Sequence, residues 1–412
     1  MKKRVCALLL ALLCLTGCGG SGGGAKSLTE TVKAAKPALQ PLTEESAAAL
    51  TGFSVDLLRE NWDGENLLLS PLSVLSALGL TANGAQGETL AQMEEVLGLP
   101  VEELNNVLAS WTEGLPQDKK CRVDLADSLW LRDDGSFEAN PDFLQTTADW
   151  YGAEVFGSRF DDAAVRDING WVEKGTHGMI DRILDEIPDD AVLYLINALA
   201  LEAEWQNVYE EWDILEQWSF FPEDREEQYV DMMRSTEYVY LEDEHAQGFR
   251  KAYQGGHWAF AALLPEEGTR LEDYIASLTG ERLYEILSAP EYREVRAGIP
   301  MFESSYSTEL SASLRAMGMT DAFEPGTADL SGMGSSDFGP LFISKVLHKT
   351  YISVDDKGTK AAAVTAVATS GGSGPAELDP TPVVFLERPF LYMLVDTETN
   401  LPAFIGAVTS IE

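Results

Sequence analysis

Side chains able to perform chemistry are sparse in this chain, and their spacing fits no familiar reaction centre. The 412 residues include four histidines, none with metal-ligand spacing to another histidine or to a cysteine: His177, His245, His257 and His348. Neither a phosphate-binding glycine-rich loop nor the G-x-S-x-G turn of many hydrolases is present. We therefore expect no metal, no cofactor and no enzymatic activity, and an exported hydrolase is a hypothesis without a motif.

Among the histidines, His348 has the most informative surroundings. Strand-like alternation places it on one face with apolar and small polar residues: Phe342, Ser344, Val346, Thr350, Ile352 and Val354. We expect that face to be buried, where a histidine is more often a hydrogen-bonded core residue than a catalyst. His348 is therefore interpreted as structural.

The most unusual stretch is GTKAAAVTAVATSGGSGPAELDPTP, residues 358–382, whose two halves differ in character. In the first half, one face of an extended chain carries only small or β-branched uncharged residues: Thr359, Ala361, Ala363, Thr365, Val367 and Thr369. Such a face can enter a sheet without burying an ion, and Lys360 on the other face stands at the entrance, where it can stay solvated. The pattern predicts a dormant strand, with Gly358 as a hinge that tolerates the torsions of the turning chain.

The second half of the stretch, SGGSGPAELDPTP, has the composition of an exposed flexible loop. The two halves together therefore indicate a segment able to form a strand, joined to an exposed flexible loop.

The first residues, MKKRVCALLLALLCLTGC, combine a basic start, a short apolar run and small residues, as in a secretory signal. Leu15-Thr16-Gly17-Cys18 resembles the bacterial lipobox, which implies cleavage after residue 17 and lipidation of Cys18. We expect a signal peptide over 1–17, a lipidated flexible tether over 18–41 and anchoring at the bacterial cell surface. Only Cys121 would remain as a second mature cysteine, so no internal disulfide is expected.

The chain is strongly acidic, with a formal charge of −39 that becomes −39 − 3 = −42 once Lys2, Lys3 and Arg4 are removed. Such a surface repels phosphate backbones and anionic headgroups. We therefore expect no nucleic-acid partner, and membrane contact only through the lipid.

Periodicity predicts helices over 44–58, 70–82, 84–98 and 101–111, with strands over 121–132 and 191–205 and a strand-rich C-terminal part. The run 191–205 is almost continuously apolar, which favours a strand covered on both faces. Neither a repeat nor a linker divides the chain. We predict one α+β domain over 42–412.

Several runs, in this order, resemble the serpin family: NLLLSPLS at 66–73, GAQGETLAQMEEVLG at 84–98, INGWVEKGTHGMIDRIL at 168–184, Asn197 with Trp205, ADLSG at 328–332, LFISKVLHKTYISVDDKGTKAAAVT at 341–365, and ERPFLYMLVD with FIGAV near the end. The resemblance covers roughly residues 42–411. It implies three β-sheets, eight or nine helices, a metastable, monomeric fold and an exposed reactive loop that acts as protease bait. A protease requires a flexible, exposed substrate, and the second half of residues 358–382 has that composition.

The resemblance also implies a mechanism in which the target serine protease is acylated by the bait and is then dragged across the main sheet as the loop inserts. The hinge of that loop would comprise Gly358, Thr359, Ala361, Ala362, Ala363 and Thr365. A hydrogen-bonded cluster beneath the opening strands would comprise Ser70, Ser73, Asn197 and His348, and Trp205 would lie where insertion begins. The inhibitor itself would contribute no catalytic residue.

The family's usual loop length places the scissile bond at Gly372-Ser373, but the longer loop of this chain also allows cleavage after Ala376 or Leu378. The small residues around these bonds, and the absence of Arg and Lys between Lys360 and Arg388, favour elastase-like or subtilisin-like extracellular proteases. The alternative, suggested by the long glycine-rich bait, is a non-inhibitory serpin that acts as a surface binding protein.

Overall fold

The computed structural model of the chain describes residues 24–116, 119–359 and 381–411. These residues form an α+β fold with sheets of seven, six and four strands and a small two-stranded sheet. Nine α-helices lie within the described ranges. The expected serpin-like architecture of three principal sheets with eight or nine helices is therefore confirmed, and the two-stranded sheet of β4 (Glu138–Ala139) and β14 (Gly334–Ser335) is additional.

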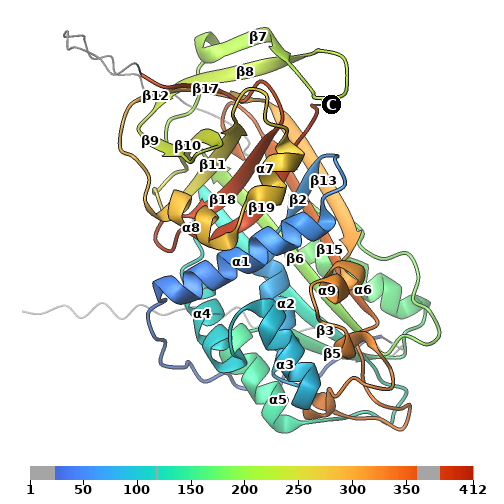
Figure 1. Ribbon diagram of the computed structural model, residues 1–412. Coiled ribbons are helices and arrows are strands. Elements are labelled where there is room, and N and C mark those ends of the chain that lie inside the picture. The colour runs from blue at the N-terminus through green and yellow to red at the C-terminus, as the bar shows by residue number, and fades with distance from the viewer. Residues whose placement is uncertain (1–23, 117–118, 360–380, 412) are drawn as a thin grey trace, which may run out of the picture.

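The helices are α1 (Glu44–Asn61), α2 (Pro71–Ala82), α3 (Gly87–Leu97), α4 (Val101–Glu113), α5 (Pro141–Thr146), α6 (Asp162–Gly175), α7 (Leu271–Ser277), α8 (Gly280–Ser288) and α9 (Ser311–Ala316). Figure 1 shows α1 crossing the middle of the molecule, with α2 beside it and α3 to α5 toward one end. The start of α2 follows from local chemistry, because Ser70 caps it by accepting from the Ser73 N–H and Pro71 occupies the first turn. Every residue of α2 is buried, which places this helix in the centre of the fold.

The main sheet has the strand order β1 (Lys26–Ser27), β5 (Glu154–Ser158), β3 (Cys121–Arg132), β6 (Leu193–Glu204), β16 (Gly358–Thr359), β15 (Lys345–Val354) and β13 (Phe302–Glu309). On one face, Tyr194 and Ile196 of β6 pack with Ile168 and Val172 of α6. The alternate residues of β6 join the large core on the other face. Both faces of β6 are thus covered, which explains its continuous apolar sequence.

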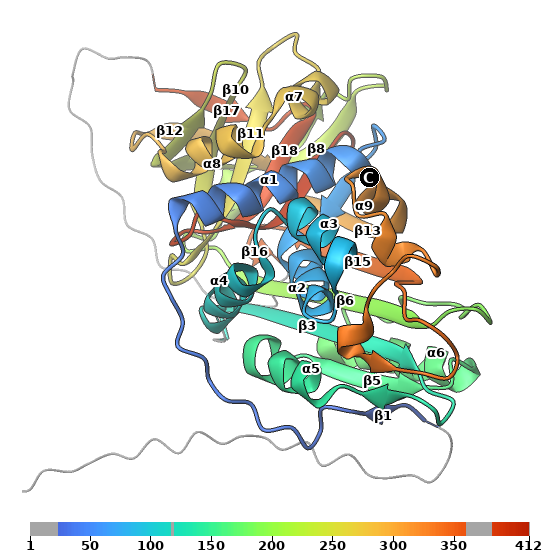
Figure 2. The ribbon, with the colours of Figure 1, turned by 60° about the horizontal axis from the view of Figure 1, so that its bottom comes forward.

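The described part of the expected tether lies along the edge of the main sheet. Lys26 and Ser27 pair with β5, and the Leu28 N–H donates to the Val155 carbonyl at 2.7 Å. Figure 2 shows β1 on the outside of β5, with the following chain leading to α1. Residues from 25 onward are therefore bound to the domain before the first helix begins.

The second sheet has the order β2 (Leu67–Leu69), β19 (Pro402–Val408), β18 (Phe390–Asp396), β11 (Trp258–Pro265), β10 (Ala246–Ala252) and β9 (Val239–Glu242). The third has the order β17 (Val383–Phe385), β12 (Val295–Pro300), β8 (Gln228–Glu237) and β7 (Ile214–Phe220), and lies at one end of the molecule (Figure 1). Among the described helices, none combines the length and the apolar character needed to cross a bilayer.

Candidate functional site

The central strands of the main sheet are joined along only part of their length. β6 and β15 run parallel and pair directly from Lys345↔Tyr194 to Lys349↔Ala198. Farther along, β16 lies between them, antiparallel to both, through Gly358↔Glu204, Thr359↔Ala203 and Thr359↔Val354. We call the line between residues 199–204 of β6 and 350–354 of β15 the seam. The first residues of the predicted dormant strand already occupy one end of it.

Gly358 fits this position for a different reason from the one expected. It is not among the described glycines with positive φ, so it does not use the conformational freedom that the sequence suggested. Instead, a Cβ at this position would lie 2.0 Å from the Ala203 carbonyl oxygen and 2.8 Å from the Glu204 Cα. The glycine is required by close approach to β6.

Thr359 anchors the inserted end of the stretch. Its side chain is buried, and its hydroxyl lies 2.5 Å from the Tyr253 hydroxyl. The Tyr253 ring stacks on Trp205, with centroids 4.5 Å apart and planes inclined by 6°. Trp205 therefore lies directly behind the point at which β16 enters the sheet.

Trp205 also fixes the turn that leads into β16. Its indole N–H donates to the Asp355 carbonyl at 2.8 Å, and its backbone N–H donates to the Lys357 carbonyl at 2.8 Å. The Lys251 ammonium lies 5.5 Å from the centroid of the Trp205 ring and pairs with Glu237 at 2.9 Å.

Next to the seam, where β6 and β15 pair directly, the four predicted cluster residues come together. His348 stands opposite Asn197 in the β6–β15 register, and its Nε2 accepts from the Ser70 N–H at 3.1 Å. The Ser73 hydroxyl donates to Asn197 Oδ1, while Asn197 Nδ2 donates to the Ser73 carbonyl at 2.6 Å. Ser70 therefore has two roles. Its side chain caps α2, and its backbone N–H donates to His348.

The cluster contains two further residues that sequence reasoning missed. Asp127 of β3 stands opposite Asn197 on the other side of β6, and accepts hydrogen bonds from Asn197 Nδ2 and from the Ser76 hydroxyl. Ser70, Ser73 and Ser76 recur every three residues along α2, so they face the sheet together. The spacing of the three serines, together with a carboxylate inside the strand 121–132, could have predicted that Ser76 and Asp127 belong to this cluster. We call these six residues the polar cluster: Ser70, Ser73, Ser76, Asp127, Asn197 and His348.

Burial perturbs both titratable members of the polar cluster. It raises the pKa of Asp127 from 3.8 to about 7, against the opposing effect of the hydrogen bonds from Ser76 and Asn197. Burial lowers the pKa of His348 from 6.5 to about 4, so the imidazole is neutral at pH 7. Its Nδ1 is buried without a hydrogen-bond partner among the described residues.

This arrangement can hold three strands together but is unsuited to catalysis. The Ser70 hydroxyl donates to the Ala403 carbonyl at 2.9 Å rather than to His348, and all members of the cluster are buried. A histidine with a pKa of about 4 is also a weak base at neutral pH. Within the described ranges, no group of three or more His, Cys, Asp or Glu side chains could hold a metal ion.

The remaining predicted residues lie outside the described ranges: Cys18, the hinge positions Ala361, Ala362, Ala363 and Thr365, and the candidate cleavage positions Gly372, Ser373, Ala376 and Leu378. They stay predictions.

Comparison with known proteins identifies the family to which this geometry belongs. The family profile "Serpin (serine protease inhibitor)" matches residues 48–411. The leukocyte elastase inhibitor of Equus caballus is 31% identical over 388 residues, which cover 89% of this chain and 100% of that protein. The chain therefore belongs to the serpin family, a family of protease inhibitors rather than catalytic enzymes in its general description.

Two solved structures distinguish conformations of this family. The native state of the thermophilic serpin tengpin matches with a TM-score of 0.89 and 42% identity, covering 94% of this chain and 100% of that chain. The latent state of tengpin matches with a TM-score of 0.80 and 40% identity, covering 91% and 100%. The fold described above is therefore more similar to the native form than to the latent one.

Proposed function

We propose that this serpin is an irreversible suicide inhibitor of extracellular serine proteases with elastase-like or subtilisin-like specificity. The observation that supports it most is the placement of β16. Gly358 and Thr359 already lie between β6 and β15, uncharged and buried, at the head of a stretch whose next residues are small. Cleavage beyond this point would let those residues extend β16 along the seam.

In this mechanism the protease performs the covalent step, and the serpin contributes the conformational change that follows it. The protease serine attacks the bait and forms an acyl enzyme. Extension of β16 must then separate β6 from β15, which breaks the five register pairs from Lys345↔Tyr194 to Lys349↔Ala198. It also breaks the bridge that α2 makes between the two strands through Ser73–Asn197 and Ser70–His348. The polar cluster would thus act as a latch that keeps the uncleaved protein closed.

The test is to mix the full chain with an elastase, a subtilisin and, as the least favoured target, trypsin. A band of summed mass on a denaturing gel, with loss of protease activity, is expected for one or both of the first two. Mass analysis of the released peptide then identifies the scissile bond among Gly372-Ser373 and the bonds after Ala376 and Leu378. Clean cleavage with the protease still active would instead support the alternative function, a non-inhibitory surface binding protein. The long glycine-rich bait favours that alternative.

We further propose that the protein is a bacterial lipoprotein displayed at the cell surface through Cys18. The supporting observation is the order of basic start, apolar run and lipobox-like residues in the sequence. Metabolic labelling with a fatty acid should label the expressed wild-type chain but not Cys18→Ala. Equal labelling of both, or of neither, would refute the anchor.

A further inference from the structure

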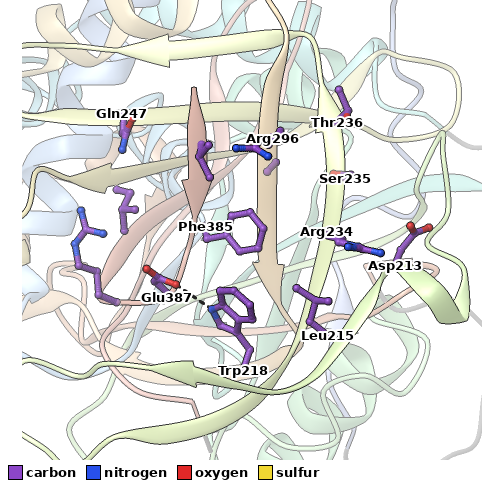
Figure 3. A pocket seen from close by; sticks show the side chains of 14 residues that line it. Asp213, Leu215, Trp218, Arg234, Ser235, Thr236, Gln247, Arg296, Phe385 and Glu387 are labelled. Carbon is purple, nitrogen blue, oxygen red and sulfur yellow. Dashed lines mark hydrogen bonds between the residues drawn. The ribbon is translucent and has the colours of Figure 1, made fainter. Parts of the chain in front are cut away.

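A cleft of about 780 Å³ opens between the third sheet and the second sheet (Figure 3). None of its lining residues belongs to the polar cluster. Residues of all four strands of the third sheet line it, and Gln247 and Leu264 of β10 and β11 close it on the side of the second sheet. Its volume lies in the range of pockets that hold small organic molecules, about 300–1,000 Å³. We call it the arginine cleft.

The register of the third sheet explains why these side chains meet. Thr236, Arg296 and Val383 stand side by side on β8, β12 and β17, and two residues along the strands stand Arg234, Gly298 and Phe385. Because side chains two residues apart share a face, both rows point to the same side of the sheet. On the opposite face of the sheet, Met233, Ala297 and Val384 are buried in the core.

The floor of the cleft is aromatic, and a glycine shapes it. A Cβ at position 298 would lie 2.5 Å from the Phe385 ring, so only glycine lets this ring lie flat against β12. The Phe385 and Trp218 rings have centroids 5.3 Å apart with planes inclined by 35°. Figure 3 shows Phe385 in the middle of the cleft, with Arg296 on one side and Trp218 on the other. These rings offer a flat apolar surface open to solvent.

The arginine cleft carries a charge opposite in sign to that of the whole chain. The lining contains three arginines and two acids, Asp213 and Glu387, and therefore carries a formal charge of 3 − 2 = +1 in a chain of net charge −39. Arg234 donates to the Trp212 carbonyl at 2.9 Å, and Arg388 donates to the Pro265 carbonyl. The exposed Arg296 guanidinium has neither a hydrogen bond nor an ion pair to another described residue.

The two acids limit the charge of a ligand. Glu387 already accepts from the Trp218 indole N–H at 2.9 Å, and Asp213 accepts from the Glu210 backbone N–H at 3.1 Å. Both carboxylates line the cleft and would repel a multiply charged anion such as a phosphate ester. A single carboxylate on Arg296 keeps the favourable fork-shaped pairing with less repulsion.

From this geometry we propose that the arginine cleft binds a small aromatic monocarboxylic acid, with its carboxylate on Arg296 and its ring over Phe385 and Trp218. This site is independent of protease inhibition. The ligand would bridge β12 to β17, an edge strand with only three register pairs that directly follows the bait stretch. Binding would therefore stabilise the closed third sheet by mass action.

The probe for the test is 2-naphthoate, with uncharged 2-naphthamide as its matched control, titrated calorimetrically into the full chain. For a compound of this size we expect a Kd of about 1 mM or tighter for the naphthoate. Loss of the carboxylate charge in the naphthamide should weaken binding about tenfold or more. Saturating naphthoate should also raise the unfolding temperature.

The matched variants are Arg296→Gln, in the cleft, and Arg166→Gln, on the exposed surface of α6. Arg296→Gln should weaken naphthoate binding about tenfold or more, whereas Arg166→Gln should leave it within about twofold. Three results would each overturn the proposal: no naphthoate binding at millimolar concentration, equal binding of the naphthamide, or unchanged affinity in Arg296→Gln. The naphthamide comparison uses the wild-type chain, so the test does not depend on the folding of a variant.

Discussion

The two titratable residues of the polar cluster oppose each other as the pH changes. The folded-state pKa of Asp127 is raised above its usual value, so the folded protein loses stability as the pH rises from about 4 to about 7. The folded-state pKa of His348 is lowered, so its contribution is complete above about 6.5 and is lost as the pH falls toward 4. Over the shared interval the two slopes have opposite signs and compensate each other.

Asp127→Asn should remove the loss of stability that Asp127 causes as the pH rises from about 4 to about 7. The amide keeps the shape of the protonated acid and never ionises, so the variant should gain stability over the wild type above pH 7 and lose that advantage below pH 4. A shift of about three units corresponds to an upper limit of about 4 kcal/mol. Unfolding midpoints from pH 4 to 8.5 measure the difference, with exposed Asp231→Asn of β8 as control. A difference from wild type that does not vary with pH would contradict this account.

His348→Gln should remove the pH dependence of stability that His348 contributes, which has the opposite sign to that of Asp127. At neutral pH the variant should be less stable, because the packing of the imidazole and its bond to the Ser70 N–H are altered. The deficit should shrink as the pH falls from 6.5 to 4. In this interval the unfolded wild type gains a proton at His348 that the folded state does not bind, whereas the variant has no such group. The same unfolding series measures it, and a deficit that grows in acid would refute the interpretation.

The sequence predicted some of these residues and concealed others for a physical reason. Ser70, Ser73, Asn197 and His348 stand in recognisable runs, and their resemblance to the serpin pattern named them. Asp127 did not stand out, because the chain has 68 acidic residues and most carboxylates on such a surface are solvated. Tyr253, which carries the contact of Trp205 with Thr359, could not be predicted, since it depends on the pairing of strands far apart in the sequence.

At the scale of elements, periodicity predicts what forms but not which strands meet. The predicted helices and the strands 121–132 and 191–205 agree with α1 to α4, β3 and β6 to within a few residues. The insertion of β16 between β6 and β15 could not be read from the same pattern, because alternation shows that a segment can be a strand without showing its neighbours. The close approach that requires a glycine at position 358 could not be predicted for the same reason, since it comes from the Ala203 carbonyl of another strand.

Thr359→Arg tests whether β16 is the start of insertion. Thr359 is 1% exposed and lies against Tyr253, so an arginine here would bury a cation or force β16 out of the seam. We expect the variant to be cleaved by the target protease without trapping it. Thr359→Ser, which keeps the hydroxyl, should still trap it. The ratio of covalent complex to cleaved serpin on denaturing gels measures the partition, and an unchanged ratio in Thr359→Arg would exclude insertion from this end.

At the scale of the whole molecule, the proposed mechanism requires a second arrangement of the same chain, in which β16 is extended along the seam. A fully extended β16 would add on the order of ten ladder hydrogen bonds, each contributing about 0.5–1.5 kcal/mol net. That sum is comparable with the stability of an ordinary domain, about 5–15 kcal/mol. The uncleaved form must then be held by a kinetic barrier, to which the direct β6–β15 pairing and the polar cluster contribute.

Cleavage of the bait without a covalent partner should therefore stabilise the protein. Limited digestion with a protease that cuts within 360–380 but is not trapped leaves the small-residue stretch free to extend β16. The unfolding temperature of the nicked chain should rise by tens of degrees, since the gain in free energy is of the order of a whole domain's stability. Calorimetry of intact and nicked samples, with the nick located by mass, measures it. The same digestion of Thr359→Arg should produce a smaller rise or none, because its insertion is blocked at the first step. If the nicked wild type melts where the intact protein does, the seam does not accept the strand, and the result supports the non-inhibitory binding function instead of trapping.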